Sequence, residues 1–263
     1  WGPNEGITMI SLKGGDIGVH LSGMLAFYYL VLPHYPYKKF MVLFWFAWLF
    51  CFLFIGVTGR AAFLTVSISA MVTVIKLGGE KWIKWAAVAV LVVLAFTFFE
   101  VEIDTGQERI VSFSQLTTNV KSIFREVEGF SGEGSKMWRI LWWQKIIDYT
   151  IFGEYFWTGK GFGINLADDD GFQVLADSAL RSPHNGHLTF LARAGVPGLF
   201  LWIGLQLSFA LSLYRSYRKL VARGYTQDAS LYIWILIYWL AFMINGAFDV
   251  FFEGPQGGIW FWS

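Results

Sequence analysis

Long uncharged apolar runs alternate with short polar connections along most of this chain. A membrane-spanning helix needs about 20 mainly apolar residues, with about 17 as the lower limit. Runs that approach or reach this length occur at Ile17–Leu32, Phe40–Val57, Ala61–Leu77, Ile83–Phe99, Gly198–Tyr214 and Leu231–Phe252, and a seventh begins near Gly257. Proline and glycine mark several of the turns between them. The pattern predicts an all-α, polytopic transmembrane helix bundle.

One long polar segment divides these runs into two groups. Transmembrane helices are expected over residues 1–99 and again over residues 187–263, and a large loop that contains amphipathic helices is expected over residues 100–186. The chain lacks an initiator methionine and stops inside an apolar stretch. We therefore expect it to be part of a longer protein with earlier spans.

Within the loop, Met137–Ile151 has apolar residues at helical spacing, namely Ile140, Trp143, Ile147 and either Thr150 or Ile151. The richness of this segment in aromatic residues predicts an amphipathic helix that lies on the membrane surface. Arg139 and Lys145 are expected at its polar or snorkelling positions.

Composition supports the membrane interpretation. The chain is 56% hydrophobic and 19% aromatic, above the roughly 45–50% apolar content of soluble domains. Its net charge of +1 gives no argument for a nucleic-acid partner. The single cysteine, Cys51, lies inside an apolar run and is expected to be a small buried hydrophobic residue.

Lysine and arginine in the short connections predict how the bundle is oriented. Basic residues gather in the connections at 33–39, 76–84 and 215–223, which fall on one side if the six spans alternate. The positive-inside rule makes that side cytoplasmic. The Thr58–Arg60 turn and the long loop then share the outer face, so Arg60 and His184 are expected on the same side. An arginine near a helix end can also simply snorkel.

The segment Ser182–Gly198 contains the strongest candidate for chemistry. Ser182 is expected as the N-cap of a helix, Pro183 as its first residue, and His184 with Asn185 in its first turn. A helix N-terminus suits an anionic ligand such as a phosphate, and it favours a neutral imidazole that could act as a general base. Gly195 to Gly198 should interrupt this helix.

Other sites have simpler interpretations. His184 and His187 could ligate zinc only with a third ligand, for which Asp177 is the obvious choice, and we expect no metal site. The glycine cluster at 158–163 lacks the arrangement of a P-loop, and it indicates a tight turn. The aspartates at 168–170 could bind a divalent cation, but a solvated loop is the commoner outcome.

Three motifs together resemble the O-antigen ligase and polymerase superfamily. Pro183–Leu201 is similar to its pattern PHNxxLxxLAxxGxPGLxL. Thr58–Leu64, TGRAAFL, is similar to its outer-turn motif with a glycine–arginine pair. Arg139–Trp143, followed by the glycines at 159–163, resembles its arginine-to-tryptophan helix and trailing glycine cluster.

The resemblance implies a GT-C-like glycosyltransferase of the bacterial inner membrane whose active site faces the periplasm. The implied donor is a glycan on undecaprenyl pyrophosphate, and the implied acceptor of a ligase is a sugar of the lipid A core. No cofactor or metal is expected. By motif, His184 is the catalytic base, and Arg60 and Arg139 hold the pyrophosphate.

Asn185, Arg181 and His187 are candidates for substrate binding, although His187 could equally support the structure. The phrase PLxGxG that often precedes the glycine cluster in this family is missing, which leaves Arg181 as a competitor for the role of Arg139.

The sequence leaves several functions open. A ligase, an O-antigen or exopolysaccharide polymerase and a protein O-oligosaccharyltransferase share these motifs. A small-anion transporter is an alternative of another class, but it would place ionisable groups at mid-membrane. The spans here are nearly free of charge apart from Asp249. A purely structural membrane subunit would tolerate substitution of His184.

Overall fold

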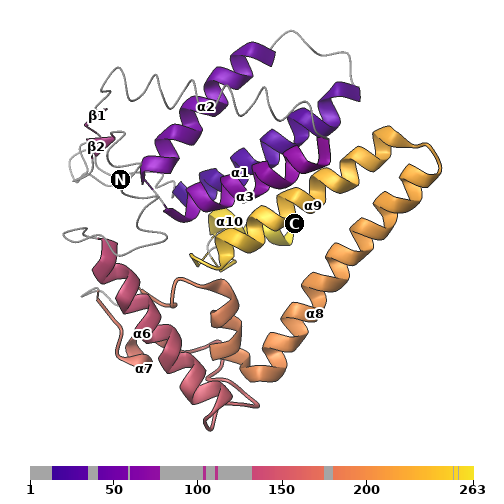
Figure 1. Ribbon diagram of the computed structural model, residues 1–263. Helices are drawn as coiled ribbons and strands as arrows, with labels where there is room; N and C mark the ends of the chain where they lie inside the picture. The colour runs from indigo at the N-terminus through magenta and orange to yellow at the C-terminus, as the bar shows by residue number, and fades with distance from the viewer. Residues whose placement is uncertain are drawn as a thin grey trace, which may run out of the picture.

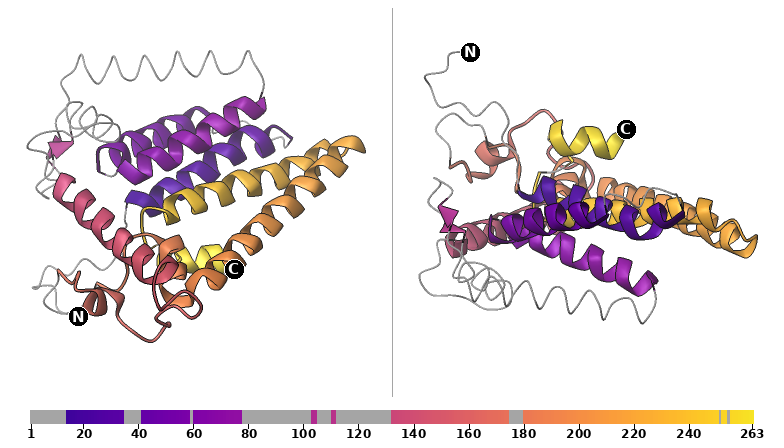
Figure 2. Two further views of the ribbon diagram at one scale, coloured as in Figure 1. Left: turned by 60° about the horizontal axis from the view of Figure 1, so that its bottom comes forward. Right: turned by 90° about the horizontal axis from the view of Figure 1, so that it is seen from above.

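The protein is an all-α membrane helix bundle with a loop-borne helical region at one end (Figures 1 and 2). A computed structural model describes residues 14–34, 41–58, 60–77, 103–104, 110–111, 132–174, 180–250, 252–253 and 255–263. The helices are α1 (Gly14–Ala26, continued by a π-helical turn Phe27–Val31 and a 3-10 turn Leu32–His34), α2 (Met41–Thr58), α3 (Arg60–Leu77), α6 (Gly132–Ile151), α7 (Leu166–Asp170), α8 (Gly186–Ala222), α9 (Thr226–Gly246) and α10 (Pro255–Trp262). Two short strands, β1 (Ile103–Asp104) and β2 (Ile110–Val111), pair antiparallel.

Three helices in the described part of the chain are long and apolar enough to cross a membrane: Gly14–His34, Gly186–Ala222 and Thr226–Gly246. Two shorter apolar helices, Leu43–Ile55 and Ala61–Leu77, accompany them. These five segments match predicted spans, although α9 ends at Gly246, before the expected Phe252. The predicted span Ile83–Phe99 lies outside the described residues. Near Gly257, where a seventh span was expected, lies the eight-residue helix α10.

Helix α1 lies at the centre of the bundle because its small residues let neighbours approach its backbone. A Cβ at Gly18 would lie 3.2 Å from the Cα of Ala62 on α3. At Gly23 the α1 carbonyl accepts a 2.9 Å hydrogen bond from the indole N–H of Trp234 on α9. Small residues and interhelical hydrogen bonds are what hold helices together in lipid, where hydrophobic burial gives little advantage.

Contacts between helices define the two ends of the bundle. At one end, a Cβ at Gly15 of α1 would lie 2.5 Å from Oδ1 of Asn245 near the end of α9. The same end holds the start of α8, since a Cβ at Gly186 would lie 3.3 Å from the carbonyl oxygen of Gly246. At the other end, the Lys76 ammonium of α3 donates to the hydroxyl of Tyr217 on α8.

Helix α8 is kinked where the sequence predicts an interruption. Gly195 has φ 68° and ψ −170°, outside the helical region, and Pro197 follows it inside the second part of the helix. A Cβ at Gly195 would lie 2.5 Å from the carbonyl oxygen of Phe156, so the kink also lets the loop backbone approach. The first part of α8 belongs to the loop region, and the second part leads from there to the turn into α9, where the two helices come together (Figure 1).

The buried face of α6 differs from the predicted one. Trp142 and Ile146 are fully buried, whereas Ile140, Trp143 and Ile147 of the predicted stripe are only partly buried. Of the two alternatives at the end of that stripe, Thr150 is buried and Ile151 is exposed. The buried stripe packs against a cluster from α7 and α8 that includes Leu166, Ala167, Leu191 and Ala192. Both stripes have helical spacing, so the packing partners decided which one turned inward.

Candidate active site at the start of α8

Helix α8 begins later than the sequence analysis predicted. Asn185 is its N-cap, and its side-chain oxygen accepts hydrogen bonds from the N–H groups of His187 (3.1 Å) and Leu188 (3.0 Å). The predicted N-cap at Ser182, and the placement of Pro183, His184 and Asn185 in the first turn, are therefore wrong. The asparagine amide satisfies two of the N–H groups that a helix start leaves unpaired.

This change places His184 before the helix, where its backbone has φ 52°. A left-handed conformation costs a non-glycine residue about 1–3 kcal/mol and is often found at functional sites. Because His184 precedes the N-cap, the argument that the first helical turn favours its neutral form no longer applies. Its neighbours must instead set the chemistry of its ring.

Asp249 is the most important of these neighbours. The Nδ1 atom of His184 lies 3.3 Å from Oδ1 of Asp249, and both side chains are partly exposed. The same carboxylate oxygen accepts the N–H of Val250 at 2.8 Å, which fixes its direction. A carboxylate can only accept, so Nδ1–H is the donor in this contact, and in the neutral ring the lone pair is then on Nε2. Asp249 was expected within a span and had no predicted role.

Helix α6 also contacts His184 and the residue before it. The ring of Trp138 meets the imidazole edge-on, with 6.3 Å between ring centroids. Trp143 donates its indole N–H to the carbonyl of Pro183 at 2.7 Å. These contacts hold the segment before α8 against the loop helix and explain why an aromatic-rich α6 lies beside the histidine.

Arg139 lies on the same side of α6. Its Nη1 donates to the carbonyl of Phe248 at 3.3 Å, so the guanidinium lies next to the turn that carries Asp249. Arg139 and Lys145 were expected at polar or snorkelling positions, but both bind protein carbonyls, Lys145 that of Asp170 at 2.7 Å. The structure therefore brings two predicted site residues, Arg139 and His184, to the segment that follows α9 and contains Phe248, Asp249 and Glu253. This segment is called the return segment.

The remaining predicted residues have different surroundings. Arg60 begins α3, which packs on α1 at the end of the bundle that also holds Asn245, but its side chain lies outside the described residues. Arg181 is exposed. In His187, Nδ1 accepts from the indole N–H of Trp202 at 3.0 Å, and Nε2 donates to a backbone carbonyl at 3.0 Å. Both ring nitrogens of His187 thus serve the packing of α8.

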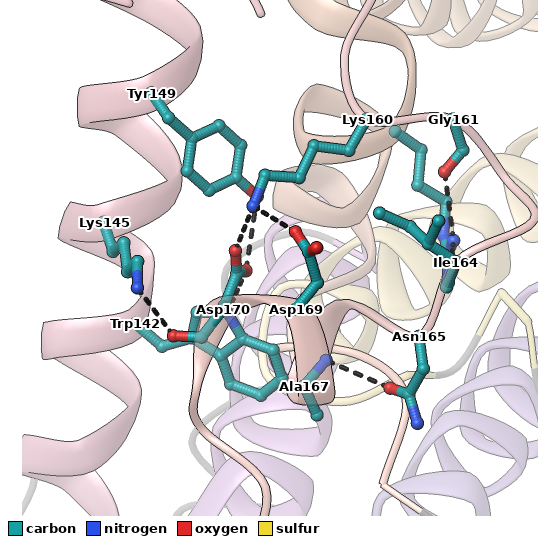
Figure 3. A network of polar contacts seen from close by, with 11 residues as sticks. Trp142, Lys145, Tyr149, Lys160, Gly161, Ile164, Asn165, Ala167, Asp169 and Asp170 are labelled. Carbon is teal, nitrogen blue, oxygen red and sulfur yellow. Dashed lines mark hydrogen bonds and ion pairs between the residues drawn. The ribbon is translucent and has the colours of Figure 1, made fainter.

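The glycine cluster and the aspartate triplet form one structural unit (Figure 3). The Lys160 ammonium lies 2.6 Å from Oδ2 of Asp169 and 2.6 Å from Oδ1 of Asp170. The buried Asp170 carboxylate also accepts the indole N–H of Trp142 at 2.6 Å and the hydroxyl of Tyr149 at 3.3 Å. Of the three aspartates only Asp168 and Asp169 are exposed, so the expectation of a solvated triplet is wrong for Asp170.

These charges shift the ionisation of the unit. Burial and the neighbouring Asp170 carboxylate raise the pKa of the Tyr149 phenol above its usual range. For the Lys160 ammonium, burial acts to lower the pKa, but the hydrogen bonds to Asp169 and Asp170 outweigh it, so the pKa is raised. Lys160 therefore stays charged.

Asp177, the suggested third zinc ligand, lies outside the described residues. Among the described residues no group of three or more His, Cys, Asp or Glu side chains is placed to hold a metal ion.

Arg193 joins this unit to the return segment after α9. Its Nη1 donates to three loop carbonyls, those of Gly161 (3.3 Å), Phe162 (3.2 Å) and Ile164 (3.1 Å). Its Nε lies 3.2 Å from Oε1 of Glu253, four residues after Asp249. Arg193 was not predicted as a site residue from the sequence, although a charged residue between apolar ones, just before a glycine and a proline that interrupt a helix, is a usable signal.

Comparison with protein-family models matches residues 44–203 to the O-antigen ligase family. The match covers more than half of the chain and includes Arg60, Arg139 and His184. The chain belongs to the O-antigen ligase family. This membership identifies it as an O-antigen ligase-type membrane glycosyltransferase, as the three motifs predicted. The match ends at residue 203 and does not include Asp249 or Glu253. Their contacts with the matched region are observed only in the structure. A search of curated proteins finds no match.

Proposed function

We propose that this O-antigen ligase family member transfers a glycan from undecaprenyl pyrophosphate to an acceptor hydroxyl at the periplasmic face, with the lipid A core as acceptor. The observation that carries the proposal is the pairing of His184 with Asp249 beside the Arg139 cation. Donor and acceptor classes follow from the family resemblance. The residues present can supply a base and positive charge without a metal.

In this mechanism His184 is the general base. Its Nδ1–H points to Asp249, so Nε2 is the atom that can take the proton of the acceptor hydroxyl. The acceptor oxygen then attacks the anomeric carbon, the bond from that carbon to the phosphate oxygen breaks, and its electron pair leaves with the undecaprenyl pyrophosphate. The proton on Nε2 is afterwards returned to solvent. A positioned base of this kind is typically worth about 10²–10⁴ in rate.

Arginines are suited to hold the leaving group because their planar fork can pair two phosphate oxygens at once. Arg139 lies next to the Asp249 turn, and Arg60 begins a helix at the same end of the bundle. Positive charge there would offset the negative charge that grows on the pyrophosphate as it leaves.

The periplasmic orientation rests on the charges at the opposite end. Lys76 contacts Tyr217 there, beside Arg215, Arg218 and Lys219 near the end of α8. Because short loops rich in lysine and arginine stay in the cytoplasm, we assign this end to the cytoplasm. His184 and Asp249 then face the periplasm, the side on which the resemblance places the active site.

The test is transfer by purified protein in nanodiscs, with a lipid-linked glycan donor and a panel of acceptors, each with and without chelator. His184→Ala should lose measurable transfer while remaining in the membrane, and His34→Ala, at the other end of the bundle, is the matched control. Near-normal transfer by His184→Ala would overturn the assignment. Arg60→Lys should lose activity because it keeps the charge but not the fork, whereas full activity would leave Arg60 a snorkelling role.

The acceptor panel tests the finer assignment separately. Transfer to lipid A core supports the ligase, whereas transfer only to a second lipid-linked glycan would identify a polymerase. Transfer only to a protein would identify an O-oligosaccharyltransferase. Solute uptake into proteoliposomes without any glycan transfer would contradict the enzymatic proposal as a whole.

A further inference from the structure

The loop that follows α6 carries three large aromatic side chains that are mostly exposed. Phe152 is 80% exposed, Trp157 74% and Phe162 65%. We propose that residues 152–163 form an interfacial anchor that seats these three rings in the headgroup boundary of the outer leaflet. The partner is the lipid surface itself, and the proposal does not depend on the reaction assigned to His184.

The rings cannot be buried by a rearrangement of the loop because its backbone is bound on the inner side. Lys160 N–H donates to the carbonyl of Ala192 at 2.8 Å, and Val196 N–H donates to the carbonyl of Phe156 at 2.8 Å. Gly159 has φ 60°, and a Cβ there would lie 2.3 Å from the carbonyl carbon of Arg193. The loop is therefore held to α8 in a conformation that leaves these three rings exposed.

The attachment point sets the depth of the loop in the membrane. It binds α8 at residues 192–196, and a few residues later α8 presents Phe200 and Leu201, which are 69% and 76% exposed. This second part of α8 belongs to a candidate span, so these side chains face lipid. The loop then lies where the span leaves the hydrocarbon, which is the level that tryptophan and other aromatic residues prefer.

The charges of the loop favour a neutral lipid surface over an acidic one. Lys160 turns inward to Asp169 and Asp170, and Glu154 is exposed. No other residue between 152 and 163 is basic. An anchor held by anionic lipid would need basic side chains on its outer side. We therefore expect insertion that depends on apolar burial and is unchanged by the fraction of anionic lipid.

The proposal can be tested with the environment-sensitive fluorophore NBD attached to single cysteines in a Cys51→Ser background. The purified protein is reconstituted into phosphatidylcholine vesicles that contain lipids spin-labelled either near the headgroup or near the chain end. NBD at Trp157→Cys and at Phe162→Cys should be quenched more by the headgroup-proximal label than by the deep label. Leu201→Cys is the lipid-facing control, and Arg223→Cys, in the exposed α8–α9 turn, is the aqueous control.

Each outcome decides the question. Quenching at both loop sites that persists when anionic lipid is added supports the anchor. Quenching by aqueous iodide alone would overturn it. Blue-shifted emission that no lipid label quenches would show that protein covers the loop, through a second copy or another partner, and would also overturn it. Leu201→Cys, reconstituted in parallel, shows whether α8 inserts under these conditions, so failed reconstitution is not mistaken for an exposed loop.

Discussion

Replacing Lys160 by methionine should destabilise the loop region because it leaves a buried carboxylate without its cation. The ammonium lies 2.6 Å from both Asp169 and Asp170. These partners differ in their surroundings, since the Asp169 side chain is 49% exposed and that of Asp170 is 0% exposed. The two ion pairs must therefore be weighed separately.

The contact with Asp169 is a surface ion pair, worth about 0–1 kcal/mol. Breaking a buried pair by removing one partner costs about 3–5 kcal/mol because the remaining charge stays desolvated. Asp170 keeps hydrogen bonds from Trp142 and Tyr149, which stabilise its anion and favour the lower end of that range. We expect Lys160→Met to cost about 3 kcal/mol, nearly all of it through Asp170.

The assay is a double-mutant cycle of Lys160→Met and Asp170→Asn, followed by hydrogen exchange in α7 and by thermal unfolding in detergent. Both single variants should lose protection in α7. The double variant should lose less than the sum of the two, because it leaves neither a buried cation nor a buried anion. Hydrogen exchange is the better measure, since unfolding of a bundle with several spans need not be two-state.

Lys145→Met is the matched control, because its ammonium donates only to the backbone carbonyl of Asp170 in the same unit. It is exposed, so its loss should cost about 1 kcal/mol or less. Equal effects of Lys145→Met and Lys160→Met would refute the argument from the buried carboxylate. Strict additivity in the cycle of Lys160 and Asp170 would refute it as well.

Three further predictions concern the site and its supports. Asp249→Asn should lower kcat about 10–10²-fold with little change in KM, because it removes the carboxylate that orients the base, and an unchanged kcat would exclude that role. Gly195→Ala should lower the thermal midpoint because its φ of 68° and the nearby loop carbonyl exclude a Cβ, whereas Gly204→Ala, which meets open space, should not. The raised pKa values of Tyr149 and Lys160 favour their protonated forms in the fold, so stability is full below about pH 10 and should fall above it. Tyr149→Phe should reduce this alkaline loss in midpoints measured against pH.

The membrane spans and the α8 kink could be predicted because their causes are local. A run of uncharged apolar residues can satisfy its backbone in lipid only as a helix. Gly195 and Pro197 disturb a helix wherever they occur, so the interruption needed no knowledge of the fold. The placement of Arg60 and His184 at the same end of the bundle followed from the number of spans between them and from the basic residues in the short connections.

The start of α8 could not be predicted because two capping solutions lie side by side in the sequence. Ser182 followed by Pro183 is a good local start, and Asn185 is another. Trp143 binds the Pro183 carbonyl from α6, and Asp249 contacts His184 from beyond α9. These long-range contacts hold the segment in a non-helical form, and neither is visible in a local pattern.

Arg193 shows why the site extends beyond its motif. One guanidinium binds the loop carbonyls of Gly161 and Ile164 on one side and the Glu253 carboxylate on the other. Glu253 and Asp249 both belong to the return segment. The Arg193 side chain that binds the glycine loop therefore also holds the segment that carries Asp249, the partner of His184. The glycine cluster, for which the sequence predicted a tight turn, is therefore part of the scaffold that positions the base.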